Sequence, residues 1–110
     1  MPKGWNQEGI KKVAEIVAGE VGSEKFNIAA TLDGDTRAMP YRYLLEVYGK
    51  TPEGVEKYPQ ANVLYLVSRD DQEKIKGYTV WEVASFAPFN IEKSREIQNG
   101  VKLYRLTKAL

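Results

Sequence analysis

The amino-acid sequence predicts an α/β sandwich of two or three layers, in which helices pack on a mixed sheet. Apolar residues recur at helical spacing from Ile10 to Val21, which predicts an amphipathic helix. Residues 63–67 are an uninterrupted apolar run, as is typical of a parallel-sheet strand that is covered on both faces. Asn99 and Gly100 are a strong signal for a tight hairpin turn. Together these observations predict a parallel β-α-β part and an antiparallel C-terminal hairpin.

The first half of the chain is predicted to fold as a helix, a strand and a second helix. The first helix is expected within residues 6–22, between an asparagine N-cap and a terminating glycine. Residues 26–32 are expected to form a strand, whose small alanines indicate that a helix packs closely on it. Pro40 fits the first turn of the second helix, and Gly49 is expected to end it.

The second half is predicted to contribute a short helix and the remaining strands. Residues 50–61 are punctuated by prolines and a glycine and are expected to form a loop. The short helix is expected within residues 68–77. β-branched and aromatic residues at 80–86 predict a strand, paired antiparallel with a last strand at 101–106. Residues 87–98 are expected to be irregular, because a proline ends the strand before them.

The length and the charge of the chain limit the classes of protein to which it can belong. Its 110 residues are the size of one domain, so a single domain spanning residues 1–110 is expected. Hydrophobic residues make up 43% and charged residues 28%, which is ordinary for a globular protein and argues against general disorder. Sixteen basic residues nearly balance fifteen acidic ones, so no global field draws the protein to nucleic acid.

Two missing residue types narrow the chemistry. Without cysteine, the chain has no disulfide, no thiol nucleophile and no thiolate metal site. Without histidine, it has no imidazole base near neutral pH and no imidazole zinc ligand. Any catalysis would therefore rest on carboxylates, lysine, tyrosine, arginine or Mg²⁺. No apolar run approaches the roughly 20 residues of a membrane-spanning helix, so no span is expected in this chain.

The strongest candidate site is the turn between the first predicted strand and the second helix. It contains Asp33, Gly34, Asp35, Thr36 and Arg37, and ligands of open α/β sheets bind at the carboxyl ends of strands. The two carboxylates have the oxygen ligands that Mg²⁺ prefers, the glycine lets a ligand approach the backbone, and the guanidinium fits a phosphate. The competing interpretation is a tight turn in which Asp35 or Thr36 caps the following helix.

Arginines form a second candidate. Arg37, Arg42 and Arg69 are expected near neighbouring strand ends, where they would form an anion pocket with Asp70 and Asp71 at its rim. The alternative is a set of surface ion pairs, which contribute little energy.

Aromatic residues are concentrated in the C-terminal half. Tyr78, Trp81, Phe86, Phe89 and Tyr104 would stack on sugars or bases if they were exposed. Because aromatic residues dominate the cores of small domains, the favoured interpretation is a core in which Phe86 meets Tyr104.

Four segments resemble a known family. They are residues 26–46 (FNIAATLDGDTRAMPYRYLLE), 61–69 (ANVLYLVSR), 81–89 (WEVASFAPF) and 100–106 (GVKLYRL). Together they resemble the soluble tail that follows the membrane helices in some bacterial glycosyltransferases of the dolichyl-phosphate-mannose mannosyltransferase (GT-C) type. The resemblance implies an extracytoplasmic accessory domain without catalysis of its own, whose partner is the membrane-embedded portion of a parent enzyme.

The sequence thus favours a non-catalytic accessory or binding domain that needs no cofactor. One alternative is a small ligand-binding or transferase domain that depends on phosphate or Mg²⁺ and uses the 33–37 turn. Another is a protein-interaction module that docks through its hairpin edge. The ligand and the oligomeric state stay open.

Overall fold

A computed structural model describes residues 7–22, 24–32, 38–54, 57–98 and 100–109. The elements follow one another as α1 (Gln7–Glu20), β1 (Phe26–Ala30), α2 (Met39–Val47), the 3-10 turn η1 (Tyr58–Gln60), β2 (Val63–Ser68), α3 (Gln72–Lys76), α4 (Trp81–Ala84), β3 (Phe89–Gln98) and β4 (Val101–Lys108).

The four strands form one mixed sheet in the order β1-β2-β4-β3. β1 and β2 run parallel, with Phe26 opposite Val63, and α2 connects them. β4 pairs antiparallel with β2 on one side and with β3 on the other. The predicted parallel β-α-β part and antiparallel C-terminal hairpin are therefore confirmed, and the hairpin closes at Gly100 with a φ of 79°.

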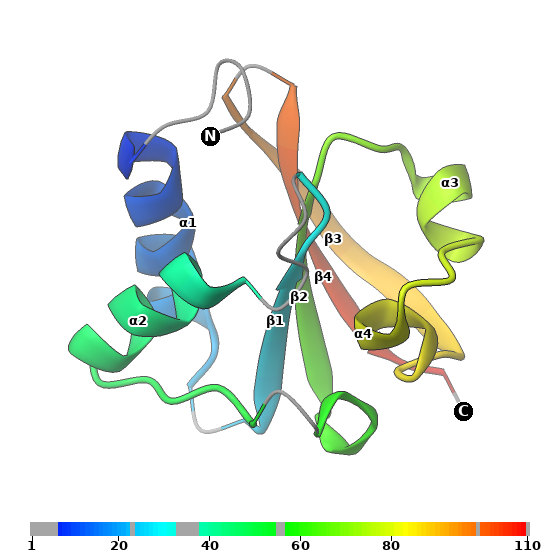
Figure 1. The fold of residues 1–110 in the computed structure, drawn as a ribbon, viewed down its shortest axis with the longest axis horizontal. Coiled ribbons are helices and arrows are strands. Elements are labelled where there is room, and N and C mark those ends of the chain that lie inside the picture. The colour runs from blue at the N-terminus through cyan, green and yellow to red at the C-terminus, as the bar shows by residue number, and fades with distance from the viewer. Residues whose placement is uncertain (1–6, 23, 33–37, 55–56, 99, 110) are drawn as a thin grey trace.

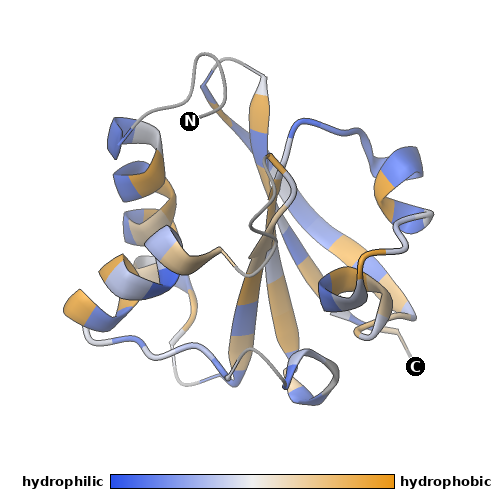
Figure 2. Cartoon of the chain, viewed as in Figure 1, coloured by the Kyte–Doolittle hydropathy of each residue, from blue (hydrophilic) through white to orange (hydrophobic). Residues whose placement is uncertain are grey.

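Helices cover both faces of the sheet, so the sandwich has three layers (Figure 1). α1 and α2 pack on the face to which Ile28 and Tyr65 contribute side chains. α3 and α4 pack on the other face, where Leu64 and Leu66 lie. All six residues of β2 are buried, as its uninterrupted apolar run predicts. In Figure 2, many residues along the central strands have the colour of hydrophobic residues.

The predicted elements of the first half are confirmed with small changes at their ends. The α1 residues Ile10, Val13 and Val17 are buried at helical spacing and contact the sheet. β1 ends at Ala30, two residues earlier than expected. α2 has proline in its first turn, where the missing N–H costs no helical hydrogen bond.

The segment from residue 80 to residue 98 differs from the prediction. Trp81–Ala84 forms helix α4 where a strand was expected, and Phe89–Gln98 forms strand β3 where irregular chain was expected. Buried Val83 and Phe86 are three residues apart, a spacing that suits a helical turn, so this short run carries no decisive period. β3 is an edge strand with both faces largely exposed. Its central residues are mostly charged, so its sequence lacks the alternation of apolar and polar residues that predicts a strand.

The described residues 53–54 of the loop after α2 contact the outer edge of β1. The Glu53 N–H donates to the Phe26 carbonyl at 2.8 Å, and the Ile28 N–H donates to the side-chain oxygen of Asn27 at 2.9 Å. The first bond joins the loop to the strand edge, and the second satisfies an edge N–H within β1 itself. All five β1 residues are buried.

Candidate functional site

The connections that follow the two parallel strands lie on opposite faces of the sheet. After β1 the chain passes to α2 on one face of the sheet, and after β2 it passes to α3 on the opposite face (Figure 1). In open α/β sheets, adjacent strands whose connections diverge in this way leave a crevice at their carboxyl ends, where ligands bind. The candidate site is therefore the carboxyl end of the two parallel strands, beyond Ala30 and Ser68.

Four polar side chains meet at this end of the strands. Thr31 follows β1 directly, and its hydroxyl donates to the Ser68 hydroxyl at the end of β2, at 2.9 Å. The Tyr78 hydroxyl lies 3.0 Å from Thr31 Oγ1 and 2.7 Å from Ser68 Oγ. It also donates to the carboxylate of Asp70. We call these four residues the crevice cluster.

Backbone contacts fix the position of Asp70 in the crevice cluster. Its N–H donates to Ser68 Oγ at 3.0 Å, and its carbonyl accepts the Tyr104 hydroxyl at 2.7 Å. Lys74 Nζ lies 3.5 Å from the second carboxylate oxygen. Ser68 is fully buried, whereas the Asp70 side chain keeps 31% of its exposure. The crevice cluster is therefore buried at Ser68 and reaches solvent at the carboxylate of Asp70.

The environment keeps the phenol of Tyr78 protonated. Burial raises the pKa of Tyr78, and its hydrogen bond to Asp70 raises it further. Burial also raises the pKa of Tyr104. At neutral pH both groups are therefore neutral and act as hydrogen-bond donors. A carboxylate beside neutral hydroxyls, with Lys74 at its second oxygen, suits a ligand that presents hydroxyl groups, which can donate to the carboxylate and accept from the hydroxyls.

The predicted 33–37 turn lies outside the described residues. Asp33, Gly34, Asp35, Thr36 and Arg37 therefore carry no structural account. In the described part of the chain, no three acidic, cysteine or histidine side chains gather as a metal site would require.

Arg42 has a different environment from the one predicted. It is buried, and its guanidinium donates to the Glu53 carbonyl at 2.8 Å, to the Tyr58 hydroxyl at 2.6 Å and to the side chain of Asn27. These bonds hold the loop at 50–61 against the edge of β1, so Arg42 is neither a surface residue nor an open anion ligand. Arg69 is exposed at the end of β2.

The aromatic residues divide between core and surface. Phe86 and Tyr104 are buried in the same apolar cluster, which agrees with the favoured interpretation, although they are not hairpin partners. Tyr78 and Phe89 are half-buried. Trp81 keeps 48% of its exposure and contacts the Tyr58 ring edge-on, at 5.8 Å between centroids.

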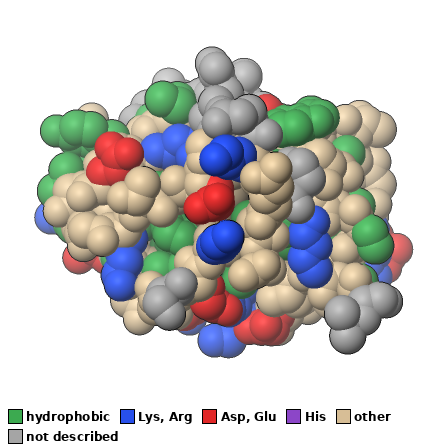
Figure 3. Space-filling view, turned by 90° about the horizontal axis from the view of Figure 1, so that it is seen from below, with side chains coloured by type: hydrophobic (Ala, Val, Ile, Leu, Met, Phe, Trp, Pro, Cys, Tyr) green, Lys and Arg blue, Asp and Glu red, His purple; other side chains and the backbone are tan. Residues whose placement is uncertain are grey.

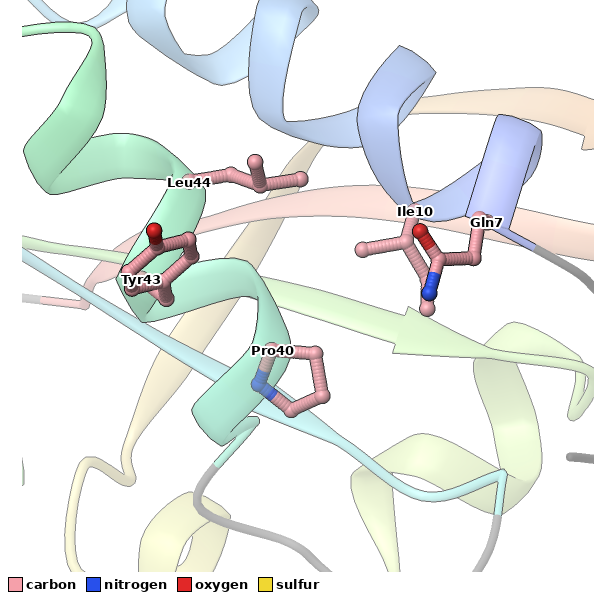
Figure 4. Close-up of a pocket in the computed structure, with 5 residues that line it drawn as sticks. All are labelled: Gln7, Ile10, Pro40, Tyr43 and Leu44. Atoms are coloured by element: carbon pink, nitrogen blue, oxygen red, sulfur yellow. The ribbon is translucent and has the colours of Figure 1, made fainter.

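Another concavity lies between α1 and α2. It is a pocket of about 280 Å³ lined by Gln7, Ile10, Pro40, Tyr43 and Leu44, whose side chains Figure 4 shows around the space between the two helices. Seen from below, the molecule shows basic and acidic side chains interspersed over its surface (Figure 3). That face therefore carries no patch of a single sign.

Sequence reasoning found the correct end of the sheet and missed most of the crevice cluster. Asp70 was expected at the rim of an anion pocket, and Tyr78 among aromatic residues for which a core position was favoured. Thr31 and Ser68 were not predicted as site residues. A usable signal was present, because each of the two buried apolar strands is followed or ended by a hydroxyl residue. Tyr78 gave no such signal, since its contact with Thr31 joins residues 47 positions apart.

Among the helices that the structure describes, none is long and apolar enough to cross a membrane. No family model, no curated protein and no solved structure shows a significant match to this chain.

Proposed function

We propose that this chain is a non-catalytic binding domain whose crevice cluster holds a hydroxyl-rich ligand such as a sugar. The observation that carries the proposal is the joint presence of Thr31, Ser68, Tyr78 and Asp70 at the point where the connections after β1 and β2 diverge. A carboxylate and several hydroxyls at such a crevice are the groups that bind polyol hydroxyls by paired donation and acceptance.

The protonation of the cluster favours binding over proton transfer. A general acid or base works best when its pKa lies near the operating pH. The pKa of Tyr78 is raised above its ordinary value and is therefore further from neutral pH. The phenol therefore donates a hydrogen bond without giving up its proton. This supports a domain that recognises a ligand and leaves any reaction to another part of an enzyme.

The resemblance to extramembrane tails of GT-C glycosyltransferases extends the proposal. An accessory domain of such an enzyme would lie outside the cytoplasm, with the membrane-embedded portion of the parent as its partner. Sugar hydroxyls are the groups that such an enzyme handles, and they match the hydrogen-bonding character of the crevice cluster. Both arguments lead to the same class of ligand.

An amide NMR titration tests the proposed function. The ligands are Mg²⁺, an uncharged monosaccharide and an uncharged disaccharide, added separately to the full chain. We expect saturable shifts from the sugar ligands at Thr31, at residues 68–71 and at Tyr78. Shifts that saturate with Mg²⁺ alone at residues 34–38 would instead favour the metal-dependent alternative at the turn.

Two variants and a matched control separate binding from folding. Asp70→Asn removes the carboxylate charge and Tyr78→Phe removes one hydroxyl, and each is expected to weaken the sugar response at least several-fold. Glu73→Gln removes a charge from an exposed side chain on α3 and is expected to leave the response unchanged. No saturable shift at millimolar ligand, or equal responses in all three variants, would contradict the proposal.

The interaction-module alternative rests on a different part of the sheet. β3 is at the end of the strand order, so its outer edge is the place where a partner strand would add. The titration distinguishes this alternative, because docking along β3 would leave the crevice amides unshifted by small ligands.

A further inference from the structure

The solvent-facing side of α2 is apolar. Met39, Tyr43 and Val47 keep 49%, 68% and 62% of their exposure. They are spaced four residues apart, so they lie along one side of the helix as a continuous row. We call these three residues the α2 stripe. Exposed apolar surface that is contiguous in this way marks an interaction site more often than scattered single residues do.

The surroundings of the α2 stripe extend its apolar surface. Pro40 and Leu44 on the adjoining side of α2 line the pocket shared with α1 (Figure 4). Of the two charged residues on α2, Arg42 is buried and Glu46 is exposed. Glu46 is therefore the single charged side chain that α2 presents to solvent, and a partner surface has to accommodate one carboxylate.

We propose that a second copy of this chain covers the α2 stripe, with the two α2 helices antiparallel about a two-fold axis at Tyr43. The stripe is self-complementary in this arrangement, because Met39 and Val47 lie one turn to either side of Tyr43. Met39 of each copy then packs against Val47 of the other, and the two Tyr43 rings meet at the axis. Such an isologous contact closes on itself and yields a dimer without further growth.

The charge of Glu46 favours an antiparallel pair of α2 helices over a parallel pair. α2 has no side-chain cap at its N-terminus and no acidic residue in its first turn. In the antiparallel pair, Glu46 of each copy comes beside the first turn of the other helix, where a negative charge is stabilising. A parallel pair would place the two Glu46 carboxylates side by side. The net charge of +1 adds little repulsion between copies.

The proposed contact between the two α2 helices is small, so the dimer is expected to have a low affinity. α2 has nine residues and is therefore about 14 Å long, so the contact falls at the low end of specific interfaces. We expect a weak dimer whose population rises with concentration. Sedimentation velocity from about 10 µM to about 1 mM covers the range in which such a weak interface fills.

Engineered cysteines give the sharper test, because the chain has no cysteine of its own. Tyr43→Cys places two thiols at the axis and is expected to form a disulfide dimer readily under mild oxidation. Val47→Cys places its two thiols about 12 Å apart along the helices, beyond the reach of a disulfide. The double variant Met39→Cys/Val47→Cys is expected to cross-link. Trp81→Cys, at a half-exposed residue on α4, measures random collision.

A charge exchange tests the same contact without oxidation. Met39→Glu/Val47→Lys is expected to associate more strongly than Met39→Glu/Val47→Glu, because each glutamate then faces a lysine of the other copy. Met39→Glu/Val47→Glu is expected to be monomeric at every concentration. Amide spectra check that each variant is folded.

Two results would overturn the inference. One is a Tyr43→Cys variant that cross-links no faster than Trp81→Cys in a chain that stays monomeric up to about 1 mM. The other is a Val47→Cys variant that cross-links as fast as Tyr43→Cys, since this would indicate parallel helices. Neither result bears on ligand binding at the crevice cluster, which lies in a different part of the molecule.

Discussion

Tyr65 is buried in the middle of the sheet, yet its hydroxyl reaches a charged group. Arg105 on β4 donates to this hydroxyl and pairs with Glu24 and Glu92, both at 2.8 Å. Burial raises the pKa of Tyr65 to about 12, although the charge of Arg105 opposes the shift. The folded state therefore holds the phenolic proton more tightly than the unfolded chain does.

This difference predicts a loss of stability in alkali. The unfolded phenol has its ordinary pKa of 10.0, and the folded one titrates near 12, so the unfolded chain loses its proton first. The free energy of unfolding should fall between these pH values, by up to about 1.4 kcal/mol per pH unit for this group. Below pH 10 the contribution is fully present.

Urea unfolding of the original chain and of Tyr65→Phe, at several pH values from 9 to 12, measures this effect. The variant should lose about 1 kcal/mol near neutral pH with the hydrogen bond to Arg105, and its stability should then fall less steeply above pH 10. Parallel curves for the two proteins would show that Tyr65 does not titrate differently on folding.

At the scale of the element, the charges on the edge strand β3 oppose self-association. In a symmetric antiparallel pairing centred on Ser94, Lys93 would face Arg95 of the second copy, and Glu92 would face Glu96. Centring the pair on Lys93 or Arg95 would place that residue opposite itself. Every nearby symmetric register therefore opposes like charges, which destabilise a strand pair and protect an exposed edge.

Replacing Lys93 and Arg95 by valine should remove this protection. Their contacts with Glu20, at 4.0 and 3.2 Å, are exposed ion pairs whose loss costs little stability. The folded variant is expected to show a larger mass than the original chain by light scattering at equal concentration. Lys11→Val/Lys12→Val removes the same charge from the exposed side of α1 and should not. Equal masses for all three proteins would argue against a protective role for the β3 charges.

The same element explains how far the sequence could predict the fold. Regular apolar patterns in α1 and β2 gave the correct elements, because both bury a periodic or continuous surface. β3 was missed because an edge strand exposes both faces and needs no alternation. Residues 81–84 were assigned to a strand because their apolar run is too short to distinguish a helix from a strand.

The candidate site was less predictable than the fold. Pattern reasoning found the carboxyl end of β1, which follows from strand order and local turn residues. It could not find that Tyr78 returns to Thr31 and Ser68, because that contact depends on how α3 packs on the opposite face. It also left Arg42 in a hypothetical anion pocket, since only the folded chain brings Asn27, Tyr58 and the Glu53 carbonyl around it.

At the scale of the whole molecule, the fold depends on the strand that comes last in the element order. β4 lies between β2 and β3, and its register with each of them covers most of its length. Its Tyr104 and Leu106 are buried beneath α3 and α4. Without β4, no strand pairing in the described sheet joins β3 to the parallel pair.

A chain that ends at Gln98 should therefore lose cooperative unfolding entirely. Its amide spectrum is expected to collapse to the narrow dispersion of an unfolded protein, because β2 and β3 each lose their antiparallel partner. Adding a peptide of residues 100–110 in excess should restore the native spectrum by filling the gap. A truncated chain with a sharp thermal transition and dispersed amides would show that the remaining elements fold without β4.

The central place of β4 has a consequence for synthesis in the cell. A ribosome translates β2 and β3 before it translates the strand that joins them, so the nascent chain carries two unsatisfied strand edges while residues 101–108 are still inside the exit tunnel. Folding must wait until those residues emerge, because until then β2 lacks its antiparallel partner.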